Sequence, residues 1–210
     1  MYWETLSVLN ELFEFVTVER PLKHISVCGN IEGVNISELL SPKYLISIYL
    51  ESISYGALGD ILPVLSQVKQ INIGLLSVDR MWCYLKLPLE SATVCSLKFD
   101  KIGSDINLTQ IRSRLEQLPN LQKLFFTEIE NQTLVDGDQW KSILRASNIQ
   151  KFYFHFVDKQ KSIKLDRHLK EILPRFQSDF WLKEKQASIK AVGGCVRRGK
   201  HSEFNLTVKF

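Results

Sequence analysis

The chain has 210 residues, of which 45% are hydrophobic and 24% are charged. This composition is typical of globular proteins that bury a continuous core, and it excludes a largely disordered chain. No stretch reaches the length of a membrane-spanning helix, and the first residues lack the basic segment and apolar run of a secretion signal. We therefore expect a protein of the cytoplasm or nucleus that does not bind a membrane.

The net charge and the cysteine spacing further limit the partners and cofactors that we expect. The net charge is +4, and residues 183–210 hold seven Lys or Arg against two Glu. Such a basic tail is either a solvated segment or a surface for an acidic partner. The four cysteines form no CxxC pair and no cluster with histidines, so we expect free thiols, no metal and no cofactor.

The first predicted element is a helix over residues 3–16, where apolar residues recur at helical spacing. We assign residues 1–20 to this N-terminal helix or cap. From there one pattern, apolar-x-x-apolar-x-apolar, recurs six times. Its clearest copy is Leu121, Leu124 and Phe126, and the six copies begin at Leu22, Leu45, Val68, Val94, Leu121 and Ile149.

The spacing of the copies predicts the architecture. Successive copies are 23, 23, 26, 27 and 28 residues apart, which is the period of leucine-rich repeats. Each copy predicts a short strand whose alternate residues point inward, and stacked copies bury what one copy leaves exposed. We therefore predict an α/β leucine-rich-repeat solenoid over residues 21–158, with parallel strands on the concave face and helices or irregular returns on the convex face.

Short returns are predicted between the first strands. Helices or turns are expected at residues 35–40 and 59–67, and an irregular return at residues 77–90. The buried side chains of the second return are predicted to be Ile61, Leu62 and Leu65.

The later returns carry clearer helix signals. Thr109 is predicted to cap a helix that ends before Pro119, and Asp136 or Asp138 to cap the next one. The inward side chains of that second helix are Trp140, Ile143 and Leu144.

Residues 159–210 are predicted to form a C-terminal cap that includes the basic tail, because the period dissolves after Val157. A helical stripe over residues 165–176 is expected to be kinked or ended by Pro174. Gly193-Gly194 predicts a turn, and alternation over residues 204–210 predicts a strand.

Candidate catalytic and ligand-binding residues do not gather at any one place in the sequence. Residues 194–200 have the spacing of a phosphate-binding loop, but His201 stands where a magnesium-binding hydroxyl is required. The aromatic run at residues 151–157 alternates like the repeat, which assigns Phe152 and Phe154 to the core. No Ser, Cys or His lies at a catalytic spacing, so we predict that the chain is not an enzyme.

The repeat does predict a surface, because residues between the inward positions project from the other face of the sheet. Aromatic side chains ringed by polar groups are typical of protein-binding hot spots. The alternative is that these aromatics pack on one another or under the cap. The predicted partner-binding residues are Tyr49, Glu51, Asn72, Lys98, Asp100, Lys123, Phe125, Tyr153 and His155.

The chain resembles the leucine-rich-repeat arm of F-box proteins, the substrate receptors of SCF-type ubiquitin ligases. The similarity covers roughly residues 20–185. It rests on the degenerate repeat, on the phrases Leu118-Pro-Asn-Leu121-Gln-Lys-Leu124 and Pro21-Leu22-Lys-His-Ile25-Ser-Val27, and on the closing segment Phe176-Gln-Ser-Asp-Phe180-Trp181. It implies that substrate binds the concave face through Tyr49, Lys98, Phe125 and Tyr153. The F-box itself is not present in this sequence, so Skp1 and cullin are expected partners only if an F-box is encoded upstream.

Two other functions compete with substrate recognition by a ligase. One is a repeat scaffold or inhibitor whose protein partner is unrelated to ubiquitin. The other is a binder of nucleic acid or acidic surfaces, using the basic tail with Lys98, Lys123 and Lys151. An affinity that falls steeply with salt would favour the binder of nucleic acid or acidic surfaces. An affinity that depends on the aromatic side chains would favour protein binding.

Overall fold

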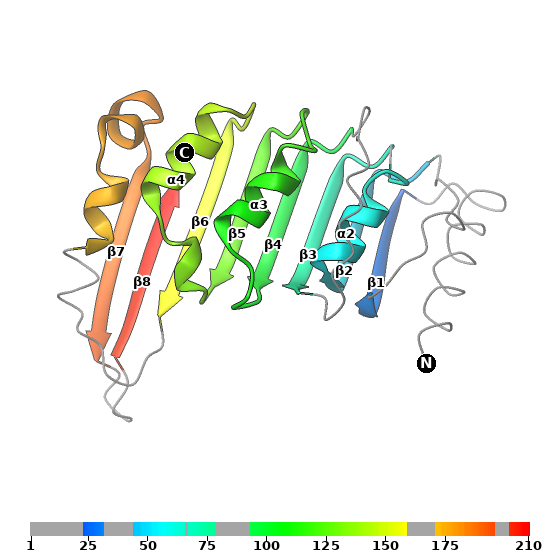
Figure 1. The fold of residues 1–210 in the computed structure, drawn as a ribbon, viewed down its shortest axis with the longest axis horizontal. Helices are drawn as coiled ribbons and strands as arrows, with labels where there is room; N and C mark the ends of the chain where they lie inside the picture. The colour runs from blue at the N-terminus through cyan, green and yellow to red at the C-terminus, as the bar shows by residue number, and fades with distance from the viewer. Residues whose placement is uncertain (1–22, 32–43, 66, 79–92, 159–170, 196–201) are drawn as a thin grey trace.

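A computed structural model describes residues 23–31, 44–65, 67–78, 93–158, 171–195 and 202–210. The fold is α/β, with one eight-stranded sheet in the order β1-β2-β3-β4-β5-β6-β8-β7 (Figure 1). The strands are β1 (His24–Ile31), β2 (Ser47–Ser54), β3 (Gln70–Ser77), β4 (Ser96–Ile102), β5 (Lys123–Ile129), β6 (Lys151–Asp158), β7 (Ser188–Cys195) and β8 (Ser202–Lys209).

Strands β1 to β6 are parallel and lie in chain order, as the repeat predicts. The second apolar residues of the six copies pair in one continuous row, Ile25, Ile48, Ile71, Leu97, Leu124 and Phe152. Each of them is buried. The parallel sheet and its register are therefore confirmed, because side chains of period two place every apolar copy on the same face.

The described helices lie on one face of the sheet, in front of the strands in Figure 1. The α-helices are α2 (Tyr55–Ile61), α3 (Leu108–Leu115) and α4 (Gly137–Arg145). Shorter helical turns are η2 (Gln132–Leu134), η3 (Leu173–Phe176) and η4 (Phe180–Glu184). Burial of the inward apolar row against these elements forms a two-layer core.

Helix starts differ from the predictions at two places. Helix α2 begins at Tyr55, four residues before the predicted start, because the Ser54 side chain accepts a hydrogen bond from the backbone N–H of Ala57. Helix α3 is capped by Asn107 and not by Thr109. Gln110 completes a capping box, since its side chain accepts from the Asn107 N–H while its own N–H donates to Asn107.

Other helix predictions are confirmed. Ile61, Leu62 and Leu65 are buried, although only Ile61 lies within α2. Asp136 caps α4, with Asp138 in the first turn. The buried side chains of α4 include Trp140, Ile143 and Leu144.

The C-terminal segment contributes two strands to the same sheet. Strand β8 pairs antiparallel with β6, and β7 pairs antiparallel with β8 at the edge. The predicted strand at residues 204–210 is confirmed as part of β8. The predicted turn at Gly193-Gly194 is wrong, because both glycines lie in β7 opposite Phe204 and Glu203.

Several predicted elements lie outside the described residues. These are the helix at 3–16, the return at 35–40, most of the return at 77–90, the first part of the stripe at 165–176 and most of the loop at 194–200. Pro174, which is described, lies at the start of η3.

Candidate functional site

The sheet face opposite α2, α3 and α4, here called the open face, carries three rows of side chains from β1 to β6. The first row is His24, Ser47, Gln70, Ser96, Lys123 and Lys151, and the middle row is Ser26, Tyr49, Asn72, Lys98, Phe125 and Tyr153. The third row lies two residues further on each strand: Cys28, Glu51, Gly74, Asp100, Thr127 and His155. None of these eighteen residues is buried.

All nine predicted partner-binding residues lie on the open face, but they do not form one cluster. Tyr49 on β2 and Phe125 on β5 are separated by three strand spacings, about 14 Å. The nine residues therefore divide into an N-terminal group on β2 and β3, a charged group on β4, and an aromatic group on β5 and β6.

The N-terminal group is held largely by contacts within the sheet. A Cβ built on Gly74 would lie 2.9 Å from the Tyr49 hydroxyl and 2.5 Å from the Glu51 carbonyl oxygen. The Tyr49 side chain therefore occupies space that Gly74 leaves free. The Glu51 carboxylate accepts a hydrogen bond from the Gly29 N–H at 2.7 Å, at the irregularity in β1 where Gly29 has a φ of 108°.

The charged group is an ion pair linked to the next strand. Lys98 Nζ lies 2.7 Å from Asp100 Oδ1, and the same oxygen accepts a hydrogen bond from Thr127 Oγ1 at 2.7 Å. Burial acts to raise the pKa of Asp100, but the hydrogen bonds from Lys98 and Thr127 and the charge of Lys98 outweigh it, so the pKa is lowered. Lys98 is thus already neutralised within the face.

Asp100 is expected to make the stability of the protein slightly dependent on pH. Because its pKa is lowered on folding, the carboxylate stabilises the fold fully above its ordinary pKa of 3.8. This contribution is lost as the pH falls through the lower pKa of the folded state. We expect Asp100→Asn to cost roughly 0.2–1 kcal/mol near neutral pH, since the pair is partly exposed, and the difference from the original chain to narrow as the pH falls below 3.8.

Urea unfolding followed by circular dichroism at several pH values measures this difference. Glu116→Gln, which removes an exposed carboxylate paired with Arg112 on α3, is the control. An Asp100→Asn variant whose stability is unchanged near neutral pH would contradict the prediction.

The aromatic group contains Phe125, Tyr153 and His155. Phe125 and Tyr153 are direct neighbours across β5 and β6. The rings of Tyr153 and His155 stack with centroids 6.5 Å apart, and His155 Nδ1 lies 2.9 Å from Thr207 Oγ1 on β8. These partly exposed rings lie at neighbouring positions of the open face, and most of the other side chains in the three rows around them are polar or charged.

Residues of β7 and β8 extend this surface, and sequence analysis did not place them there. Lys209 pairs with Tyr153, Thr207 pairs with His155, and Lys190 pairs with Thr207. Paired residues share a sheet face, so all three lie on the open face. Alternation over residues 204–210 indicated a strand, but its position between β6 and β7 had no local signal.

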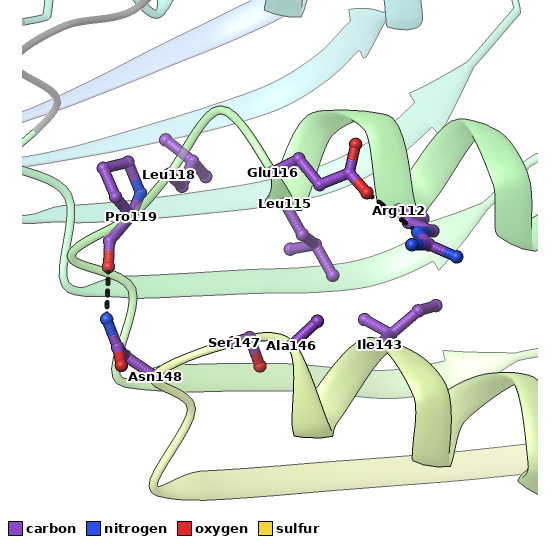
Figure 2. A pocket seen from close by; sticks show the side chains of 9 residues that line it. All are labelled: Arg112, Leu115, Glu116, Leu118, Pro119, Ile143, Ala146, Ser147 and Asn148. Atoms are coloured by element: carbon purple, nitrogen blue, oxygen red, sulfur yellow. Dashed lines mark hydrogen bonds and ion pairs between the residues drawn. The ribbon is translucent and has the colours of Figure 1, made fainter.

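A small cavity lies on the helical side of the molecule, between α3 and α4 (Figure 2). Its volume is about 240 Å³, and its buried apolar side chains are Leu115, Leu118 and Ile143. Arg112 and Glu116 form an ion pair beside it, and Asn148 donates to the Pro119 carbonyl at 2.9 Å. Among the described residues, neither His nor Cys lines it, and the Ser147 hydroxyl donates to the Leu144 carbonyl.

Among the described residues, no three His, Cys, Asp or Glu side chains gather where a metal ion could be held. No helix in this part of the chain is long and apolar enough to cross a membrane. No protein-family model, curated protein or solved structure matches the chain.

Proposed function

We propose that this chain is a non-enzymatic interaction module of the leucine-rich-repeat type, which binds a protein partner on the open face of its sheet. Substrate recognition for an SCF-type ubiquitin ligase is the role that the sequence resemblance implies, and we propose it as the cellular context. The face would then be concave, with the helices on the convex side.

One observation carries the protein-binding proposal. Phe125 and Tyr153 lie side by side in the middle row of a sheet face that none of the described α-helices covers, and charged or polar groups lie in the adjoining rows. Aromatic side chains bury much apolar area with little loss of conformational entropy, and a polar rim excludes water around them. Protein-binding hot spots combine these two properties.

The repeat period and the register support the leucine-rich-repeat part of the proposal. Six strands at intervals of 23 to 28 residues align in one parallel row, with helical returns on the opposite face. A stack of this kind presents side chains from every copy on one surface, and partners of repeat proteins bind such surfaces.

Removing both aromatic side chains is expected to release the partner. The Phe125→Ala, Tyr153→Ala variant should lose at least about 90% of the partner captured by the tagged chain from native cells, because each hot-spot truncation costs about 1–2 kcal/mol or more. Quantitative mass spectrometry of the captured proteins measures the loss, and circular dichroism checks that the variant is folded.

The matched control removes two exposed apolar side chains that are not part of the three rows of the open face. Tyr44 and Leu182 are 54% and 50% exposed, and the Tyr44→Ala, Leu182→Ala variant should retain the partner. Equal capture by both variants would overturn the proposed binding face. Skp1 or cullin among the captured proteins would support the ligase context, and a partner captured without them would reject that context while leaving protein binding intact.

A further inference from the structure

Four lysines gather around the aromatic group at the C-terminal half of the open face. They are Lys123 on β5, Lys151 on β6, Lys190 on β7 and Lys209 on β8, and all four are exposed. Lys123 pairs directly with Lys151, and Lys209 with Tyr153. The four lysines lie on the same face of four adjacent strands; those on β5, β6 and β8 lie next to the aromatic residues, and the one on β7 lies two strands away from Tyr153. Together they are called the basic patch.

This basic patch has no internal carboxylate partner in the described part of the chain. The ion pairs there join other residues, and none includes Lys123, Lys151, Lys190 or Lys209. No described Asp or Glu lies in the three rows of the open face on β5 or β6. Like charges on neighbouring strands destabilise a sheet, so an uncompensated patch favours an anionic ligand.

The N-terminal half of the same face has the opposite character. Glu51 on β2 and Asp100 on β4 lie in the third row, and Asp100 neutralises Lys98 at 2.7 Å. A long polyanion that followed the face beyond β5 would meet these carboxylates. In the described rows of the open face, the lysines without a carboxylate partner therefore lie on the four strands β5, β6, β8 and β7, which span about 15 Å.

We propose that the basic patch binds an acidic, extended polypeptide segment of the partner, whose carboxylates contact the four lysines and whose apolar side chains contact Phe125 and Tyr153. This inference rests on the proposed function and specifies the chemical character of the partner segment. Polypeptide is favoured over nucleic acid because the patch contains lysine without arginine. The described arginines, Arg112, Arg114, Arg145 and Arg175, belong to α3, α4 and η3, whereas arginine forks are the usual phosphate ligands.

Fluorescence anisotropy with the full chain tests the proposal. The probe is a fluorescein-labelled peptide of repeating Glu-Ala-Glu-Leu, compared with the same peptide carrying Gln in place of Glu and with a single-stranded oligonucleotide of equal charge. We expect the Glu peptide to bind at least about tenfold more tightly than either, with an affinity that falls as salt rises. Lys123→Glu, Lys151→Glu should weaken it at least about tenfold.

The control variant makes the same charge change on the helical side. Lys141 lies in α4 and Lys183 in η4, and Lys141→Glu, Lys183→Glu should change the affinity by less than about twofold. An equal loss in both double variants would mean that net charge alone attracts the peptide, which would overturn the proposal.

Two further outcomes would also overturn it. An oligonucleotide that binds as tightly as the Glu peptide would assign the patch to nucleic acid. Equal or absent binding of the Glu and Gln peptides would reject an acidic partner. Rejection of an acidic partner would not by itself reject the proposed function. Protein binding on the open face stands if capture of the cellular partner still depends on Phe125 and Tyr153.

Discussion

Replacing Trp140 by alanine is expected to lower the free energy of unfolding by about 3–5 kcal/mol. Trp140 is fully buried in α4. Its ring centroid lies 5.2 Å from those of Phe126 and Phe152 and 5.9 Å from that of Phe154. The substitution removes the aromatic contacts that Trp140 makes with two adjacent strands and leaves a cavity among rigid rings, which cannot collapse to fill it.

The Trp140 side chain also makes a polar contact that can be separated from its packing. Its Nε1–H donates to the Leu134 carbonyl at 2.8 Å. Trp140→Phe keeps most of the apolar contact but leaves this buried carbonyl without its donor, so we expect a smaller loss of about 1–3 kcal/mol.

Urea unfolding followed by circular dichroism measures both Trp140 variants. Leu182→Ala, at a side chain that is 50% exposed, serves as the control and should change stability by less than about 0.5 kcal/mol. A Trp140→Ala variant as stable as this control would mean that α4 does not depend on the aromatic cluster.

Replacing Asn131 by alanine is expected to cost about 2–4 kcal/mol, although the side chain is small. Its Nδ2 donates to the backbone carbonyls of Gly103, Ser104 and Ile106, at 2.9, 3.2 and 2.6 Å. Its Oδ1 accepts from the Thr133 N–H at 2.9 Å. Asn131 is only 6% exposed, so its loss leaves several backbone groups that water cannot easily satisfy.

Asn148 provides a matched control because it makes the same type of hydrogen bond at a solvent-exposed position. Its Nδ2 donates to the Pro119 carbonyl at 2.9 Å, but Asn148 is exposed. Asn148→Ala should therefore cost less than about 1 kcal/mol, since water replaces the amide. Equal unfolding free energies for the two variants would show that Asn131 does not link the loop after β4 to the end of β5.

The sequence was most informative where a contact depends on local periodicity. The inward row from Ile25 to Phe152 could be aligned from the sequence alone, because a strand exposes alternate residues on opposite faces. The same reasoning placed Phe125 and Tyr153 together on the open face. The sequence offered Asp136 or Asp138 as the cap of α4, because helix capping needs only a short polar side chain at a fixed position, and the structure selects Asp136.

Two predictions were wrong at places where a few neighbouring residues are compatible with more than one local structure. Asn107 and Thr109 are both suitable caps, and Gln110 three residues after Asn107 decides between them by completing the capping box. Gly193-Gly194 is compatible with a turn, yet both residues accept an extended conformation when β8 provides a partner strand. The local sequence allowed either state, and the strand pairing selected one.

The sequence by itself determined the parallel core sheet and the side chains on each of its faces, because both follow from a pattern of period two repeated at regular intervals. Only the tertiary structure decided that β8 inserts between β6 and β7, that Lys190 and Lys209 join the patch of Lys123 and Lys151, and that Asn131 binds carbonyls 25 to 28 residues earlier. These contacts join segments that are distant in the chain. They depend on which edges and buried groups remain unpaired after the local elements have formed, and no local pattern records that.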